Sequence, residues 1–307
     1  MKKNMVNQTH IEGILYEHTL ERKKSGPQSK NPGTEYIAGS IKVATNDELN
    51  NICEVFYTYV TPLTSTGKKN KAYSVLSDII DGEIGTILKN GKEEAGKVSI
   101  DSAFALNEWY DKDDNLVSTL RNEGGFINVV SALSEDEKLR NTFKTDILIT
   151  GIKRIEADED RQIAEHIDLR GIIFNFRKEI LPVTFSVYNE NAMNYFEGLD
   201  ISSKNPVFTK VWGRQESTTI KIQKVEESAF GEPSITTMER NRKSYTITGA
   251  ISECYDWDTE ETLLASEVQE AMAQREITLA EIKTRRDEYN SKKNEAKPVI
   301  VQGGFDF

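Results

Sequence analysis

Two stretches decide the fold: HIEGILYEHTLE at residues 10–21 and FKTDILITGIKRIE at residues 143–156. Both are rich in β-branched residues, which favours a long strand. Each carries a Gly-Ile pair near its middle, at Gly13 and Gly151. Glycine inside a strand marks a bulge or a sharp bend, and a small closed barrel needs such bends in its long strands. We therefore expect one barrel to begin in each half of the chain.

The elements that follow these stretches have the same order in both halves. Three strands, a helix and two closing strands are predicted, and a glycine recurs in each second strand, at Gly39 and Gly171. The later elements are 35–44, 52–62, 71–88, 97–110 and 124–130 in the first half, and 166–177, 179–189, 190–199, 208–215 and 218–225 in the second. This is the order of the OB-fold, a five-stranded barrel used for oligonucleotides. The alternative is a pair of unrelated β-sandwich or α+β units.

The C-terminal region differs from both halves. Ser266 and Gln269 have the spacing of a helix cap. A seven-residue rhythm then predicts one amphipathic helix through Val268, Met272, Leu279, Ile282 and Tyr289. This helix either packs back on the barrels or mediates self-association into a homo-oligomer. The expected organisation is mainly β with minor α: a first OB-like domain at 1–140, a second at 141–250, an acidic segment with the helix at 251–296, and a flexible tail at 297–307.

The composition fits a globular protein of the cytoplasm. The 307 residues are 37% hydrophobic and 29% charged. Cys53 and Cys254 are far apart and lie in apolar surroundings, which is typical of a reducing compartment. The first lysines have no apolar run behind them, and no stretch approaches the roughly 20 apolar residues of a membrane helix. We expect no signal peptide and no membrane contact.

No pattern in the sequence predicts catalysis. It contains neither a G-x-x-x-x-G-K-[ST] phosphate loop nor a G-x-G-x-x-G turn after a strand. His10, His18 and His166 have no Cys or acidic partners at metal-ligand spacing. The DKDDN turn at 111–115 opens like a calcium loop but lacks the Gly and the closing Glu of such a loop. We therefore expect a binding protein without catalytic residues, metal or cofactor.

The sequence does contain aromatic residues interleaved with basic ones. Side chains alternate along a strand, so Lys210, Trp212 and Arg214 share one face, as do Phe174 and Phe176. Cations that follow phosphates and rings that stack on bases hold single-stranded DNA without sequence preference. The predicted DNA-binding residues are Lys68, Lys69, Lys71, Tyr73, Trp109, Phe174, Phe176, Arg177, Lys178, Lys210, Trp212, Arg214, Arg240, Arg242, Lys243 and Tyr245. Core packing is the alternative for the rings, and a solvated loop is the alternative for the basic hairpins.

The formal net charge of −11 is unevenly distributed along the chain. From Glu253 to Glu270 there are seven acidic residues and no Lys or Arg. Binding depends on local patches, so the acidity argues against a histone-like protein and not against a groove binder. We expect this acidic run to repel phosphate and to compete with DNA for the basic residues.

The sequence GGFDF at residues 303–307 follows a polar linker. It resembles the tails of bacterial single-stranded DNA-binding proteins, whose acidic-aromatic tip recruits replication and repair proteins. Those tips carry several Asp residues and usually a Pro before the last Phe, whereas this tip has a single acid. The resemblance implies that Phe305, Asp306 and Phe307 bind replication or recombination proteins.

A longer block, residues 205–249, resembles a family of bacteriophage proteins from replication modules of Gram-positive hosts, as do GGFINVV before it and GGFDF after it. The resemblance covers most of the chain from Glu35 onward and includes no catalytic motif. It implies single-stranded DNA binding in phage DNA replication or recombination, in the host cell cytoplasm. The alternatives are a phage structural or assembly protein and a replisome adaptor that binds protein only.

Overall fold

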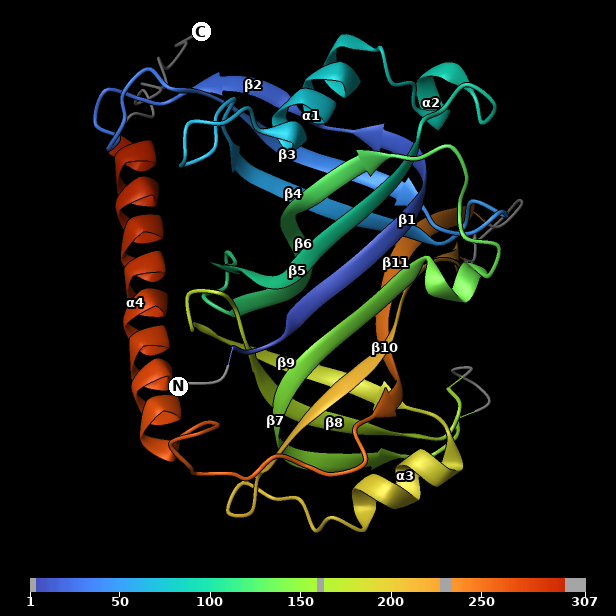
Figure 1. Cartoon of the computed structure of the whole chain (residues 1–307), viewed down its shortest axis with the longest axis vertical. Coiled ribbons are helices and arrows are strands. Elements are labelled where there is room, and N and C mark those ends of the chain that lie inside the picture. The colour runs from blue at the N-terminus through green and yellow to red at the C-terminus, as the bar shows by residue number, and fades with distance from the viewer. Residues whose placement is uncertain (1–3, 159–162, 227–233, 296–307) are drawn as a thin grey trace, which may run out of the picture.

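The strands close into two rings (Figure 1). The computed structural model describes residues 4–158, 163–226 and 234–295, without the side chains of 218–226, 234–242 and 292–295. The first ring consists of β1 (Asn7–His18), β3 (Glu35–Ala44), β4 (Ile52–Val60), β6 (Leu116–Val129) and β5 (Lys97–Tyr110). Pairing follows that order and returns to β1, with β4 and β6 parallel and the other pairs antiparallel. A short β2 (Glu21–Lys24) pairs with the outer part of β3.

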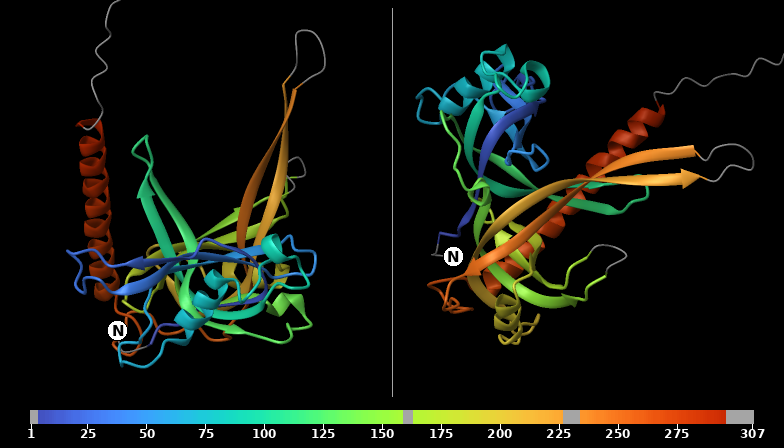
Figure 2. Two further views of the ribbon diagram at one scale, coloured as in Figure 1. Left: turned by 90° about the horizontal axis from the view of Figure 1, so that it is seen from above. Right: turned by 90° about the vertical axis from the view of Figure 1, so that its right-hand side faces the viewer.

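The second ring repeats this pairing. It consists of β7 (Asn141–Ile155), β8 (His166–Phe174), β9 (Ile180–Val187), β11 (Ser234–Ala250) and β10 (Val207–Glu226). Pairing again returns to the first strand, and β9 and β11 are parallel. Both rings therefore have the strand order of the OB-fold, and the predicted fold class is confirmed. Figure 2 shows that the β5–β6 and β10–β11 hairpins extend well beyond the rings.

The rings are joined by pairing between β1 and β7, in the register Asn7↔Thr145 to Ile11↔Asn141. A single sheet thus runs through both rings. The first ring also contributes a side chain to the core of the second, where the ring centre of Phe104 of β5 lies 5.6 Å from the ring centre of Phe143. The predicted domain boundary at residue 140 falls where β7 begins, and the division into domains there stays a prediction.

A helix between the third and fourth strands plugs each ring. In α1 (Lys71–Asp81), the Asn70 side chain caps the first turn, and Ala72, Leu76 and Ile79 face the core. The helix stops at Gly82, which adopts φ 80°. The predicted helix over 71–88 is therefore shorter and is followed by the turn α2 (Ile87–Asn90). The counterpart α3 (Glu190–Glu197) is capped by Asn189 in the same way.

The segment between the rings is tied to β1. It contains η1 (Glu137–Leu139) and ends at Arg140, whose guanidinium donates to the Ser134 carbonyl at 2.7 Å and to Asp47 at 2.7 Å. The buried Glu12 carboxylate accepts hydrogen bonds from the N–H and hydroxyl of Ser134. Burial alone would raise the pKa of Glu12, but these hydrogen bonds and His10 hold it below its ordinary value.

The C-terminal helix α4 (Ala265–Glu295) stands beside both rings in Figure 1. Its first turn packs on the outside of the second ring, where Leu263 and Val268 join a cluster with Phe174 and Phe208. Packing back on the barrels is thus observed at this end. Beyond Val268 no residue of the predicted apolar stripe is buried: Met272 is 49% and Tyr289 is 65% exposed, and Leu279 and Ile282 are half-buried. None of the described helices is long and apolar enough to span a membrane.

The four predicted bend glycines occupy irregular or crowded backbone. Gly39 and Gly151 lie at shifts in strand register. A Cβ at Gly13 would lie 2.1 Å from the carbonyl oxygen of Ala44, and one at Gly171 would lie 2.5 Å from that of Leu148. The expected irregularity is thus found at Gly39 and Gly151, whereas Gly13 and Gly171 allow a close approach of backbone that the sequence did not predict.

We predict that Gly13→Ala destabilises the protein by about 1–3 kcal/mol, because the new methyl group would have to displace backbone. Gly151→Ala is the matched control, since a Cβ at Gly151 would meet nothing within 4 Å and the cost should be below that of Gly13→Ala. Urea unfolding followed by circular dichroism measures both. Equal losses in the two variants would contradict the crowding at Gly13.

Candidate nucleic-acid interface

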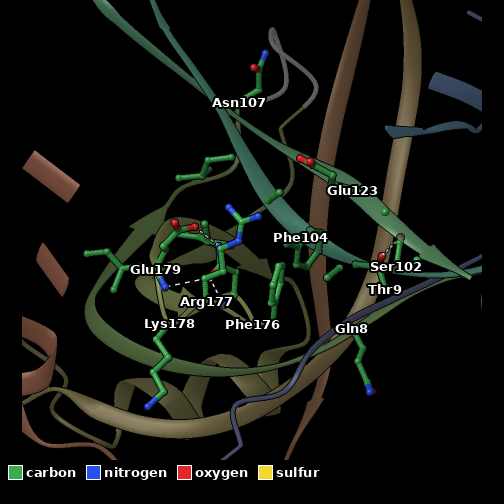
Figure 3. A pocket seen from close by; sticks show the side chains of 18 of the residues that line it. Gln8, Thr9, Ser102, Phe104, Asn107, Glu123, Phe176, Arg177, Lys178 and Glu179 are labelled. Atoms are coloured by element: carbon green, nitrogen blue, oxygen red, sulfur yellow. Dashed lines mark hydrogen bonds between the residues drawn. The ribbon is translucent and has the colours of Figure 1, made fainter. Parts of the chain in front are cut away.

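A cleft of about 1480 Å³ lies between the two rings. Its walls come from β1, β5 and β6 of the first ring, from β7 and the β8–β9 turn of the second, and from one face of α4. Figure 3 shows Phe176, Arg177 and Lys178 at the β8–β9 turn, across from Ser102 and Phe104 of β5. The cleft is therefore assembled from segments that are far apart in the sequence.

The β8–β9 turn holds an exposed ring in place. The Asn175 side chain accepts hydrogen bonds from the N–H of Arg177 at 2.9 Å and of Glu179 at 3.0 Å. Lys178 closes the turn with φ 64°, in the left-handed region. Phe176 is consequently 88% exposed, and the Arg177 guanidinium lies 5.2 Å from its ring centre.

A second exposed ring comes from the GGF sequence of β6. Gly124 and Gly125 have φ of 67° and 101°, and a Cβ at Gly125 would lie 1.9 Å from the carbonyl oxygen of Asp101. The β5–β6 register shifts opposite them, between Asp101 and Ala103. This bulge turns Phe126 outward, where it lines the cleft and is 75% exposed.

Four acidic side chains that line the cleft on the strands and on the β8–β9 turn already have partners. Glu123 accepts from the Arg121 guanidinium at 2.6 Å, and Glu179 accepts from the Asn175 amide at 2.6 Å. Asp101 lies 2.8 Å from Nδ1 of His10. A fourth, Glu108, is paired with Arg275 of α4.

Three cations of the cleft have no such acidic partner among the described residues. Lys144, Arg177 and Lys178 are exposed and form no ion pair with any residue that the structure describes. These three cations give the β7 and β8–β9 side of the cleft a local positive charge in spite of the overall negative charge, whereas Glu267 and Glu270 line the α4 side.

Lys144 belongs to a row of neighbouring side chains that crosses β1, β7 and β10 and continues beyond the cleft. Lys144 is the register partner of Gln8 on β1 and of Trp212 on β10. Side chains of directly opposed residues are neighbours on the sheet surface, so Trp212 lies beside Lys144. The indole packs over Gly249 of β11 and is 38% exposed. Trp212 thus does not line the cleft but extends its floor.

Of the residues predicted from the sequence, Phe176, Arg177 and Lys178 line the cleft. Lys68, Lys69 and Lys71 are exposed near the start of α1, away from the cleft lining, and the nearby Tyr73 donates its hydroxyl to Glu35. Trp109 is 41% exposed on the β5–β6 hairpin, also outside the lining. The structure therefore brings neither the residues near the start of α1 nor Trp109 together with the β8–β9 turn.

One predicted stacking residue is a core residue instead, and another is partly buried against the core. Phe174 is 1% exposed in the cluster beneath the start of α4, so the prediction for it is wrong: strand alternation pairs it with Phe176, but the strand ends before Phe176. Tyr245 packs edge-on against Phe104 at 5.4 Å and donates to the Leu120 carbonyl. Burial raises the pKa of Tyr245, as expected for a phenol away from solvent.

The remaining predicted residues have mixed surroundings. Lys210 and Arg214 do share a face with Trp212, but Lys210 lies 3.8 Å from the buried Asp146 and faces the ring of Tyr255. Arg214 is half-buried beside a small polar cavity, and Lys243 is exposed on β11 outside the cleft lining. The side chains of Arg240 and Arg242, and the whole of Phe305, Asp306 and Phe307, lie outside the described residues.

Sequence reasoning missed Phe126 and Lys144 as site residues. Phe126 carried a signal, because two consecutive glycines before an aromatic residue in a strand indicate a bulge that redirects the ring. Lys144 carried none, since its place in the cleft depends on the pairing of β7 with β1. No group of His, Cys, Asp or Glu suited to a metal occurs in the part of the chain that is described.

The ring order and the cleft define an OB-fold protein with an aromatic, cation-bearing groove. The chain belongs to the YorF family, whose model matches residues 5–303. A solved structure that it resembles is a deletion mutant of the single-stranded DNA binding protein from Thermus aquaticus, with 10% identity and a TM-score of 0.47 over 84% of this chain and 98% of that chain. No curated protein matches the chain.

We predict that Lys178→Gly stabilises the protein by up to about 1 kcal/mol, because glycine relieves the left-handed strain of the turn. Lys178→Ala removes the same charge and keeps a Cβ, so it is the matched control and should show no such gain. Thermal unfolding of the two variants measures the difference. A Gly variant no more stable than the Ala variant would show that the turn is unstrained.

Proposed function

We propose that this protein binds single-stranded DNA without base specificity in the cleft between its two rings. The observation that carries the proposal is that two exposed phenylalanines, Phe126 and Phe176, line one cleft with three cations that form no ion pair within the described residues. Rings stack on bases and cations follow the backbone in proteins that hold single strands. A phosphate alone would not stack on exposed phenylalanines. We therefore expect a ligand that carries both aromatic bases and phosphates.

A single strand fits this arrangement better than a duplex does. Stacking on Phe126 and Phe176 requires free base faces, which a duplex keeps inside its own stack. The rings emerge from a bulge and a tight turn, both fixed by backbone geometry, so little ordering entropy is lost when a base stacks on them.

The biological role that we propose is coating of single strands in phage DNA replication or recombination, in the host cell cytoplasm and without catalysis. Phe305, Asp306 and Phe307 would recruit partner proteins of that process. Support for the role and for the tip comes from the sequence resemblances.

Deleting Phe305, Asp306 and Phe307 should leave DNA affinity unchanged while abolishing binding to a replication partner.

The rival functions differ in what they require of the isolated protein. A structural or assembly protein forms a large defined assembly without DNA, whereas an adaptor binds a partner protein and no oligonucleotide. Sedimentation with and without poly-dT separates these cases, because only our proposal expects a DNA-dependent change.

Our first test of the cleft is removal of its rings. Phe126→Ala and Phe176→Ala should each weaken poly-dT binding by about 1–3 kcal/mol, or about 5-fold to 150-fold, through lost stacking. Leu88→Ala is the control, because Leu88 is 60% exposed and lies outside the cleft. Fluorescence anisotropy gives the affinities. Wild-type affinity in both phenylalanine variants would remove the basis of the proposal.

The cations give a second, independent test. Each phosphate contact contributes about −0.7 to the slope of log affinity against log salt for a single strand. Lys144→Ala and Arg177→Ala should therefore each make the slope less steep by about 0.7. Lys153→Ala removes an exposed charge outside the cleft and should leave the slope unchanged. Unchanged slopes in all three variants would place the phosphates elsewhere.

A further inference from the structure

The helix α4 crosses the mouth of the cleft. Its residues Glu270, Gln274 and Thr278 face into the cleft, on the side opposite the two rings of strands. Figure 1 shows it spanning the height of both rings, from the outside of the second to the level of the first. A strand lying in the cleft would therefore pass between α4 and the sheet.

The two ends of α4 are attached by different forces. At the N-terminal end, Val268 is 8% exposed and Leu263 is 0% exposed in an apolar cluster on the second ring. From residue 269 to residue 291 no side chain of the helix is buried. The beginning of the helix is thus fixed by the hydrophobic effect, and the remainder is not.

The remainder is held to the β5–β6 hairpin of the first ring by ion pairs. Arg275 pairs with Glu108, Arg286 pairs with Asp114, and Lys283 lies 3.9 Å from the same Asp114. The Asp114 side chain is 60% exposed. Exposed ion pairs contribute only about 0.2–1 kcal/mol each and weaken with salt, so the attachment at Asp114 can open without unfolding either ring. The Arg275–Glu108 pair is more enclosed, with side chains 16% and 12% exposed, and holds the helix nearer its fixed end.

We propose that α4 is a latch, fixed at Val268 and released at Asp114, which opens to admit single-stranded DNA and closes over it. The inference rests on the proposed function of the cleft. Two acids of the predicted competing run, Glu267 and Glu270, line the cleft. They disfavour phosphate near the helix, so the strand lies against Lys144 and Arg177 while α4 prevents its lateral escape.

Binding of circular and of linear single-stranded DNA distinguishes a helix that opens from one that stays closed over the cleft. A linear oligonucleotide can thread beneath a closed helix, whereas a circular single strand can enter only if the helix opens. We would replace Asp113 and Arg286 by cysteine in the full chain carrying Cys254→Ser, and join them with a cleavable bismaleimide. Cys53 is buried and stays in place. Arg286→Cys with Asn290→Cys is the matched control, because its crosslink stays within the helix.

Protein crosslinked before mixing should bind a linear dT oligonucleotide and fail to bind circular single-stranded DNA. Protein crosslinked after loading on the circle should stay bound in about 1 M salt, where charges are screened beyond roughly 3 Å, until the linker is cleaved. Equal binding and equal salt release of circle and line would overturn the latch alone. Failure of the uncrosslinked protein to bind either DNA would overturn the proposed function as well.

A milder variant tests the release point. Asp114→Asn removes the partner of Arg286 and Lys283, and Asn tolerates the φ of 64° at this position. Dissociation from circular DNA should become up to about fivefold faster, as expected from the loss of exposed ion pairs. Asp113→Asn makes the same charge change on the same turn and should dissociate like the wild type. Equal rates in both variants would contradict release at Asp114.

Discussion

One edge of β1 is divided between two partners, and the cleft depends on that division. Residues Asn7–Ile11 of this edge pair with β7, residues Ile14–His18 pair with β3, and Gly13 lies between them against the carbonyl of Ala44. Had β3 continued along the whole edge, the first ring would be closed to its neighbour. Because it stops, the second ring hydrogen-bonds to the first, and the walls of the cleft keep a fixed separation.

Side chains reinforce the same junction. The Asn7 amide donates to the Phe104 carbonyl at 3.0 Å and its oxygen accepts from the Phe104 N–H at 2.9 Å, so it acts as a further rung between β1 and β5. Phe104 then inserts among Phe143, Phe185 and Tyr245 of the second ring. The aromatic contacts thus fasten β5 of the first ring to the core of the second where the backbone pairing ends. A rigid floor of this kind positions Lys144 beside Trp212.

The sequence predicted the order of the elements better than the site. Strand order follows from local patterns and turn residues, and each half of the chain contains its own set of them. The site depends on where a strand ends and on which strands of different halves meet. Phe174 and Phe176 illustrate the first limit, because alternation places both on one face, whereas Asn175 starts a turn that leaves one ring buried and the other exposed. Lys144 illustrates the second, since nothing local to it reveals the pairing of β7 with β1.

The shared edge of β1 also sets an order of events during synthesis. The first ring cannot close until β5 and β6 have left the ribosome, and its segment Asn7–Ile11 still presents unpaired backbone groups until β7 follows. An open strand edge is a template for another chain, so nascent chains on one messenger are exposed to mispairing during this interval. The segment is only 5 residues long, with Gln8 and His10 facing outward, and a short, polar edge recruits a foreign strand poorly. The edge of β1 that joins the two rings in the folded protein is therefore a poor site for mispairing during synthesis.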